Sequence, residues 1–258
     1  MISNLTFIHQ DAIIGKDVNI EPFTYIGGNV IIGDGTWVGP SAVILDGARI
    51  GKNCRIFSGA VISGIPQDLK FYGEETTVEI GDNTKIREGV TINRGTASVG
   101  KTVVGNNCLL MAYSHVGHDC QIGNNCIIAN MTGLAGETKV GDWVIISGGT
   151  FVHQFSHIGS HVIIGPLCKV RMDVPPFIKA ERDPLTYMGL NVVGLTRRGF
   201  EKERIDEIHN IYRAIYQNGM NTTQASEYIE KEFKQSSDRD YILEFIRTSE
   251  RGIIRGPK

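Results

Sequence analysis

Aliphatic residues recur every six positions along most of the first 170 residues of the chain. The series runs from Ile14 to Ile62, resumes from Ile80 to Ile92, and resumes again from Val104 to Val170. Glycine often follows the aliphatic residue, and a small or β-branched residue stands four positions after it. An α-helix has a period of 3.6 residues and a flat strand has a period of 2, so neither explains a strict period of six.

A chain that turns a corner every six residues does explain this period. We expect the aliphatic side chain to fill the inside of each corner, the glycine to permit the bend, and the small residue to fit the narrowing interior. Three such segments make one coil, and successive coils then stack roughly 4.8 Å apart, the usual spacing between strands. The pattern therefore predicts a triangular parallel β-helix.

Two segments interrupt the repeat. Residues 63–79 place Asp68 and Glu74 where aliphatic residues belong, and residues 94–103 also lose the pattern. Both are expected to be loops that project from a rigid prism, and such loops commonly carry function. The repeat ends near residues 173–177, where paired prolines are expected to stop strand pairing.

From about residue 200 the period becomes that of an amphipathic helix. Apolar residues from Ile205 to Tyr216 share one helical face, which ends at Asn218 and Gly219. Residues 221–233 and 237–247 predict a second and a third amphipathic helix. The predicted fold is thus mainly β. A left-handed parallel β-helix covers residues 1–190, and a C-terminal α-helical domain covers residues 191–258.

Composition narrows the class of partner. The net charge is −2 and the pI is near 6.4, which gives no reason to expect nucleic acid as a partner. The N-terminus lacks a basic segment followed by an apolar one, so no signal peptide is expected. No apolar run approaches the roughly 18 residues that a membrane span needs. We therefore expect a cytoplasmic protein.

The five cysteines all occupy the small-residue position of the repeat. They are Cys54, Cys108, Cys120, Cys126 and Cys168. Buried free cysteines usually fill space in a core, and no pair of cysteines here has the spacing of a metal site. The repeat therefore predicts that they pack the interior and act neither as nucleophiles nor as metal ligands.

His118 is the residue that the repeat does not explain. It stands two positions after Val116, at an outward corner where packing does not require an imidazole. With coils of 18 residues, Gly136 and Gln154 are its equivalents one and two coils further along, and His153 adjoins Gln154. This ridge offers a general base, a backbone N–H for an oxyanion, and hydrogen bonds for a substrate. The alternative from the residues alone is a set of solvated surface histidines.

The other histidines offer weaker cases. His9, His157, His161 and His209 have no such alignment and are expected to be solvated. His115, His118 and His153 would supply enough imidazoles for a metal ion. However, His115 and His118 are three positions apart around a bend, which does not place both on one face. No metal and no other cofactor is expected.

Seven motifs carry a resemblance across essentially the whole chain. They are "QDLKFYGE" (67–74), "TINRGT" (91–96), "HVGHDC" (115–120), "LAG" (134–136), "VHQF" (152–155), "DVPPF" (173–177) and "GLTRRGF" (194–200). In their order and spacing the chain resembles the bacterial UDP-N-acetylglucosamine O-acyltransferases that begin lipid A biosynthesis. The six-residue rhythm alone is less specific, because many acetyl- and acyltransferases share it.

The resemblance implies a direct transfer from a carrier to a sugar. His118 matches the catalytic histidine, which takes the proton of the glucosamine 3-hydroxyl as that oxygen attacks a 3-hydroxyacyl thioester on acyl carrier protein. Asp119 matches the acid paired with it, and Gly136 would donate its N–H to the oxyanion. Asp68 and Lys70 would touch the sugar and acyl portions. No covalent acyl-enzyme is implied.

Further matches imply where the two substrates bind. His115, His153 and Gln154 would line the same cleft. Asn191, Arg197 and Arg198 match residues near the nucleotide, where guanidinium groups suit a diphosphate. The resemblance also implies a homotrimer with sites between neighbouring prisms. Six basic residues between 169 and 198 are compatible with docking of an acidic carrier protein, or equally with a solvated face.

Three positions depart from the family pattern. Glu137 stands where a histidine is frequent, Val193 replaces a common glutamate, and Pro166 falls where the depth of the acyl groove is set. The length of the acyl chain is therefore open. Two other functions remain alternatives. One is the related UDP-3-O-acyl-glucosamine N-acyltransferase, which usually carries an extra N-terminal uridine-binding domain. The other is a non-catalytic β-helix scaffold.

Overall fold

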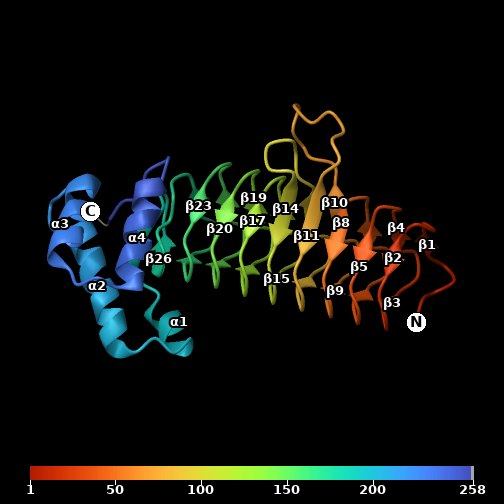
Figure 1. Ribbon diagram of the computed structural model, residues 1–258, viewed down its shortest axis with the longest axis horizontal. Coiled ribbons are helices and arrows are strands. Elements are labelled where there is room, and N and C mark those ends of the chain that lie inside the picture. The colour runs from red at the N-terminus through yellow and green to blue at the C-terminus, as the bar shows by residue number, and fades with distance from the viewer. Residues whose placement is uncertain (257–258) are drawn as a thin grey trace.

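The protein, seen in a computed structural model that describes residues 1–256, is a long three-sided prism with helices at one end (Figure 1). Each face is a sheet, and the chain passes from face 1 to face 2 to face 3 in every coil. All strand pairs of the three faces are parallel except the last pair of face 3, and successive coils pair in register, as in Val116 with Leu134 and Leu134 with Val152. The fold is a left-handed parallel β-helix followed by helices, as the period of six predicts.

Most strands are only two residues long. Face 1 consists of β1 (Phe7–Ile8), β4 (Tyr25–Ile26), β7 (Val43–Ile44), β10 (Val61–Gly64), β13 (Thr91–Asn93), β16 (His115–Val116), β19 (Gly133–Leu134), β22 (Phe151–Val152) and β25 (Lys169–Val170). Face 2 consists of β2 (Ile13–Ile14), β5 (Ile31–Ile32), β8 (Ala48–Ile50), β11 (Thr77–Ile80), β14 (Lys101–Val104), β17 (Gln121–Ile122), β20 (Lys139–Val140) and β23 (His157–Ile158). Face 3 consists of β3 (Asn19–Ile20), β6 (Trp37–Val38), β9 (Arg55–Ile56), β12 (Lys85–Ile86), β15 (Leu109–Leu110), β18 (Ile127–Ile128), β21 (Ile145–Ile146), β24 (Ile163–Ile164), β26 (Ile178–Glu181) and β27 (Thr186–Leu190).

The core consists of the aliphatic residue that ends each short strand and the small residue that precedes the next one. Ile62, Val116 and Leu134 are fully buried, and they stack along the axis with their equivalents in neighbouring coils. All five cysteines are buried and free, as the repeat predicts. Burial raises the pKa of the Cys120 thiol to about 12. This cysteine therefore stays protonated at neutral pH and offers no nucleophilic thiolate.

The glycine that follows the aliphatic residue has a different role from the one expected. Gly81 and Gly123 do not adopt positive φ, and the bend is made two residues later, where Asn83 and Asn125 have φ of 58°. A Cβ at Gly81 would lie 2.6 Å from the amide nitrogen of Asn106 in the next coil. Glycine is therefore needed because the backbones of stacked coils approach closely, whereas the corner tolerates asparagine and aspartate in the left-handed conformation.

Two boundaries also differ from the expectation. Strand β10 ends at Gly64, β11 begins at Thr77 and β14 begins at Lys101, so the projecting loops are residues 65–76 and 94–100. Both leave the prism at the corner between faces 1 and 2 and stand next to each other (Figure 1).

The prolines near residue 175 do not end strand pairing. Strand β26 pairs parallel with β24, and β27 turns back antiparallel, because the prolines precede these strands.

Four helices follow the sheets: α1 (Val192–Arg197), α2 (Lys202–Gln217), α3 (Thr222–Glu232) and α4 (Ser237–Thr248). The sequence predicted the last three, and the short α1 was missed. Helix α3 begins with a capping box between Asn221 and Gln224. The hydroxyl of Tyr212 in α2 donates to the carbonyl of Pro176 at 2.6 Å, which joins this helix to the end of the prism. Within residues 1–256, no helix is long and apolar enough to cross a membrane.

Candidate active site

A cleft of about 580 Å³ runs along face 1 beside the corner where the two loops emerge. Its wall is largely apolar and includes the exposed side chains of Ala135 and Phe151 from successive coils. Polar groups gather at both ends, with Gln67 and His118 at one end and Lys169 and Arg171 at the other. The cleft therefore has room for an extended molecule whose middle part is apolar.

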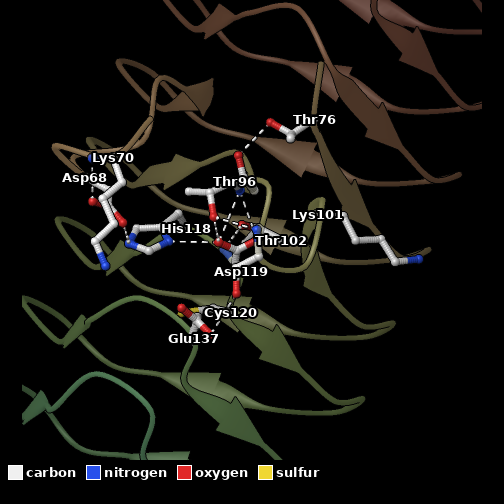
Figure 2. Close-up of polar contacts among 12 residues, drawn as sticks. Asp68, Lys70, Thr76, Thr96, Lys101, Thr102, His118, Asp119, Cys120 and Glu137 are labelled. Atoms are coloured by element: carbon white, nitrogen blue, oxygen red, sulfur yellow. Dashed lines mark hydrogen bonds and ion pairs between the residues drawn. The ribbon is translucent and has the colours of Figure 1, made fainter. Parts of the chain in front are cut away.

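His118 and Asp119 form the polar centre of this cleft (Figure 2). The Nδ1 atom of His118 lies 2.9 Å from Oδ2 of Asp119, whose side chain is fully buried. Two donors of Thr96 hold the same carboxylate: its amide lies 2.9 Å from Oδ1, and its hydroxyl lies 2.7 Å from Oδ2. The Asp119 amide donates to Oγ1 of Thr102 at 2.8 Å. The pair is thus fixed by loop 94–100 on one side and by β14 on the other.

These contacts determine which nitrogen of His118 carries the proton. An ionised carboxylate accepts hydrogen bonds and cannot donate them, so Nδ1 of a neutral His118 is the protonated nitrogen. The lone pair is then on Nε2, which faces Asp68 at 3.8 Å and adjoins Gly136. His118 is 8% exposed, less than expected for an outward corner, because loop 65–76 covers it. The imidazole is therefore oriented to act as a base at Nε2.

Gly136 lies one coil beyond His118, as the period of 18 predicts. A Cβ at this position would collide with Nε2 of His118, so only glycine permits the close approach. Within residues 1–256, the Gly136 N–H donates to no protein acceptor. A free N–H beside the imidazole is the arrangement that stabilises an oxyanion formed next to a general base.

Loop 65–76 brings the acidic and basic side chains of its turn to the same place. The Lys70 amide donates to Oδ1 of Asp68 at 2.9 Å, which leaves Oδ2 of Asp68 toward His118 (Figure 2). The Thr76 hydroxyl donates to the carbonyl of Gly95 at 2.6 Å, so the two loops are bonded to each other. Asp68 and Lys70 therefore lie at the mouth of the cleft beside His118.

Three further predicted residues line the cleft: His115, His153 and Gln154. Nδ1 of His115 lies 2.7 Å from the hydroxyl of Thr91. Burial, followed by the neighbouring His118, lowers the pKa of His115, which favours a neutral imidazole. His153 is exposed, and its Nδ1 lies 3.0 Å from the carbonyl of Gln154. Among residues 1–256, no group of histidine, cysteine or carboxylate side chains is arranged to hold a metal ion.

Asn191, Arg197 and Arg198 do not meet His118 within one chain. They line a second cavity of about 810 Å³ with Trp143 and His161, on face 3 and its corner with face 2. Oδ1 of Asn191 caps α1 by accepting from the amide of Gly194. The guanidinium of Arg198 lies over the Trp143 ring, 4.9 Å from its centroid. The predicted residues thus fall into two groups on different faces of the prism.

Two histidines in this half of the molecule were placed wrongly. His161 stacks on Phe177 and contacts Phe200, and His157 lies 4.5 Å from the ring of Phe245. Both are half-buried, because the helices cover the last coils of the prism. Burial lowers the pKa of His161 to about 4, with the charges of Arg198 and Arg204 acting in the same direction.

Comparisons with known proteins identify the family of this chain. Residues 29–64 and 101–136 match a family described as bacterial transferase hexapeptide (six repeats), and residues 173–254 match domain 2 of UDP-N-acetylglucosamine O-acyltransferase. A Chlorobaculum parvum protein named acyl-(acyl-carrier-protein)–UDP-N-acetylglucosamine O-acyltransferase is 53% identical over 95% of this chain and 93% of its own length. This chain belongs to that acyltransferase family.

Solved structures of the family have the same fold throughout. A UDP-N-acetylglucosamine acyltransferase from Bacteroides fragilis is 55% identical with a TM-score of 0.97, over 99% of this chain and 100% of the other. One from Francisella novicida is 40% identical with a TM-score of 0.97, over 100% of this chain and 95% of the other. The acyltransferase fold therefore extends over both the prism and the helices.

The three departures from the family pattern have distinct surroundings. Oε2 of Glu137 accepts from the Ser98 hydroxyl at 3.2 Å, so this carboxylate fastens loop 94–100 to the next coil. Val193 is 63% exposed at the start of α1 and lines the second cavity. Pro166 is exposed at the corner between faces 3 and 1, and it does not line the face 1 cleft within residues 1–256.

Sequence reasoning missed two residues of this candidate site. Thr96 holds Asp119, and Asn93 lines the cleft with its side chain 5% exposed. The side-chain nitrogen Nδ2 of Asn93 donates to the carbonyl of Ile65 at 3.0 Å, whereas Oδ1 of the same side chain has no partner within residues 1–256. Both belong to the quoted motif "TINRGT". That motif is the signal that could have singled them out, because buried polar atoms need partners.

Proposed function

We propose that this chain transfers a 3-hydroxyacyl group from acyl carrier protein to the 3-hydroxyl of UDP-N-acetylglucosamine, the first step of lipid A biosynthesis. The single observation that supports the chemistry is the ordered series from Thr96 through Asp119 to His118, with Nε2 of His118 beside the free N–H of Gly136. The names of the relatives supply both substrates, acyl carrier protein and UDP-N-acetylglucosamine.

In the proposed reaction, the sugar 3-hydroxyl oxygen attacks the carbonyl carbon of the thioester while Nε2 of His118 accepts its proton. The imidazolium that forms is stabilised by Asp119, whose carboxylate already accepts from Nδ1 at 2.9 Å. Negative charge develops on the carbonyl oxygen, and the Gly136 N–H donates to it. The carbon–sulfur bond then breaks, and the thiolate of the carrier takes the proton from His118. No acyl group is bound to the protein at any stage.

The two separate groups of residues support a site between copies of the chain. His118 faces the cleft on face 1, whereas Arg197 and Arg198 line the cavity at face 3. One substrate would contact both groups if a neighbouring prism brought its face 3 cavity against this face 1 cleft. We propose a cytoplasmic homotrimer, and a mass in solution of three times 28.4 kDa by light scattering would support it. A monomer that is fully active would contradict it.

The test of the chemistry is the variant His118→Ala. We expect it to reduce transfer of a 3-hydroxyacyl group from carrier protein to UDP-N-acetylglucosamine by roughly 100- to 10,000-fold, because general base catalysis contributes about that much. Product would be identified by mass spectrometry, using a ladder of 3-hydroxyacyl chain lengths. His209→Ala is the matched control, because His209 is exposed on α2 and far along the chain from the cleft.

Two outcomes would point elsewhere. Full activity of His118→Ala with an unchanged melting temperature would overturn the mechanism. Acylation of the 3-O-acylated glucosamine at nitrogen, with none of UDP-N-acetylglucosamine, would identify the N-acyltransferase instead. Absence of binding to any UDP-sugar by calorimetry would favour the scaffold.

A further inference from the structure

Both ends of loop 65–76 are held by residues at and just after the end of β13. Nδ2 of Asn93 donates to the carbonyl of Ile65 at 3.0 Å, at the start of the loop. At the other end, the Thr76 hydroxyl donates to the carbonyl of Gly95 at 2.6 Å. These two bonds fix where the loop leaves the prism and where it returns, but they do not reach its central turn.

Arg94 lies in the chain between these two anchors and contacts the middle of the loop. Its guanidinium lies over the Phe71 ring, 5.3 Å from the centroid, which is within the range of a cation–π interaction. Within residues 1–256, Arg94 forms no ion pair, and its Nε is buried without an acceptor. Its side chain also donates to the carbonyl of Asp46, at a long 3.4 Å. The Phe71 ring is therefore a main partner of this charge.

Arg94 occupies the place of His118 in the preceding coil. Ile92 pairs with Val116, and each of the two polar residues stands two positions after its aliphatic residue. Arg94 thus belongs to the ridge that carries His118 and Gly136, yet it does not line the face 1 cleft in the part of the chain that the structure describes. Its side chain is turned to the loop.

The turn that contains Phe71 carries Asp68. The Phe71 N–H donates to the carbonyl of Asp68 at 3.0 Å, and the Lys70 N–H donates to Oδ1 of Asp68 at 2.9 Å. A contact that fixes the Phe71 ring therefore also fixes this carboxylate, whose Oδ2 lies 3.8 Å from Nε2 of His118. Leu69, in the same turn, is fully exposed, so burial of its side chain does not hold the turn in place.

We propose that Arg94 is a positioning residue for the acyl transfer. Its guanidinium holds the Phe71 ring, and with it the turn that carries Asp68, so that Oδ2 of Asp68 stays beside Nε2 of His118. Without this contact the loop keeps its two anchored ends, but the central turn moves and Asp68 leaves the mouth of the cleft. This inference rests on the proposed function, because it concerns how one part of that reaction's site is kept in place.

The contact can be removed from either side. Arg94→Gln removes the cation, and Phe71→Leu removes the aromatic ring but keeps an apolar side chain. Each should lower kcat/KM for UDP-N-acetylglucosamine by roughly 5- to 20-fold, because losing one partly desolvated cation–π contact lowers the population of the held turn by about that factor. Arg94→Lys keeps a cation and Phe71→Tyr keeps a ring, so both should stay within about three-fold of the wild type.

A double-variant cycle with Asp68→Asn separates positioning from general stabilisation. In the Asp68→Asn background, Arg94→Gln should lower kcat/KM by less than about two-fold further, because the carboxylate that Arg94 positions is already gone. A purely structural role would give the full loss again, together with a lower melting temperature. The proposal is overturned if the two losses multiply, if Arg94→Gln keeps the kcat/KM of the wild type, or if neither conservative variant restores activity.

Hydrogen exchange tests the contact without any assay of transfer. The backbone N–H groups of Lys70 and Phe71 are both bonded to Asp68, so their exchange reports whether the turn is held. Exchange in a peptide that covers residues 65–76 should be about 5-fold faster or more in Arg94→Gln and in Phe71→Leu, and close to that of the wild type in Arg94→Lys. Unchanged exchange in Arg94→Gln and Phe71→Leu would also overturn the proposal.

Arg55→Gln is the matched control, because it removes a guanidinium that lies 5.0 Å from the centroid of the Trp37 ring on face 3, away from both loops. It should leave kcat/KM and the exchange of loop 65–76 within about two-fold of the wild type. Absence of transfer from any donor by the wild-type chain would contradict the proposed function itself. Exchange of the loop would still decide in that case whether Arg94 holds the turn.

Discussion

Two corners of the same prism are built from the same six-residue repeat but differ in whether side chains accept from their backbone N–H groups. At the corner between faces 2 and 3, the residue two after the aliphatic is Asp82, Asn106, Asn124 or Asp142 in successive coils. Each side chain accepts the backbone N–H of the equivalent residue one coil earlier, as Asn124 does from Asn106 at 2.9 Å. At the last coil, the Ser160 N–H donates to the hydroxyl of Tyr241 in α4. Within residues 1–256, this ladder therefore leaves none of these corner N–H groups for a ligand.

At the corner between faces 1 and 2, the equivalent residues are His118, Gly136 and Gln154. Gly136 has no side chain, so it cannot cap the N–H of His118, and its own N–H has no acceptor within residues 1–256. Both projecting loops leave the prism at this corner. A structural repeat thus offers a candidate reactive site where the side chains that satisfy its backbone are left out.

Among the changes that test this difference between the corners, the largest effect should come from restoring a side chain at Gly136. Gly136→Ala places a Cβ against Nε2 of His118, which displaces the imidazole and narrows access to the free N–H. We expect kcat to fall roughly 100- to 1,000-fold, the range measured when an oxyanion donor is removed. Steady-state kinetics of acyl transfer would measure it.

Gly123→Ala is the control at the ladder corner, where the Cβ would lie 2.9 Å from the amide nitrogen of Asp142. It should lower the melting temperature without a comparable loss of kcat in the protein that remains folded. Equal losses of kcat in the two variants would show that the two corners do not differ in function.

A smaller loss of activity is expected from Thr96→Val. The change is nearly isosteric. It keeps the hydrogen bond from the backbone N–H of Thr96 to Asp119 and removes the hydroxyl that donates to Oδ2 at 2.7 Å. Hydrogen bonds to charged groups contribute about 1.5–3 kcal/mol, so a kcat lower by roughly 10- to 150-fold is expected, with KM little changed.

Thr96→Ser keeps the hydroxyl and should retain kcat within about two-fold. If serine fails to rescue the loss, or if valine raises KM and leaves kcat unchanged, then Thr96 does not act by positioning Asp119.

A loss of stability without loss of activity is expected from Asn124→Ala at the ladder corner. Its side chain accepts from the Asn106 amide and from the Asn106 side chain, at 2.9 and 2.8 Å. Both bonds are solvent-exposed, so we expect a cost of about 1 kcal/mol and a melting temperature lower by roughly 2–4 °C.

Calorimetry and the transfer assay would measure the two effects of Asn124→Ala, with exposed Lys139→Ala as the control. A large fall in kcat in Asn124→Ala would contradict the division of roles between the corners.

The two corners also show what could be predicted from the sequence. The period of six and the stacking of His118 on Gly136 follow from spacing alone, because coils of equal length must superpose. The role of the glycines was predicted wrongly. They permit the close approach of neighbouring coils, not the bend, and this approach cannot be deduced from the sequence of one coil. Thr96 was missed because only the path of loop 94–100 brings it to Asp119, 23 residues away.

The helices explain the remaining errors. Amphipathic periods predicted α2, α3 and α4, but the sequence does not say which coil they cover. His157 and His161 therefore looked solvated, although Phe245, Phe177 and Phe200 enclose them. Contacts between a repeat and a non-repeating domain depend on docking, which no period encodes.

The last effect depends on pH and concerns His161, in the last coil of the ladder corner. Its folded-state pKa of about 4 lies below the usual 6.5, so the folded protein binds fewer protons than the unfolded chain between these values. Stability that is present above pH 6.5 should therefore decline as the pH falls toward 4. Because the ring is only half-buried, we expect His161 to contribute about 1–2 kcal/mol of that decline. Melting temperatures of the wild type and of His161→Gln, measured from pH 7.5 to pH 4, would test this expectation. The variant should lose less stability than the wild type over that range. Burial also lowers the pKa of His157, so part of the dependence of stability on pH should remain in the variant. Identical slopes would show that the charge of His161 is not linked to the docking of the helices on the ladder corner.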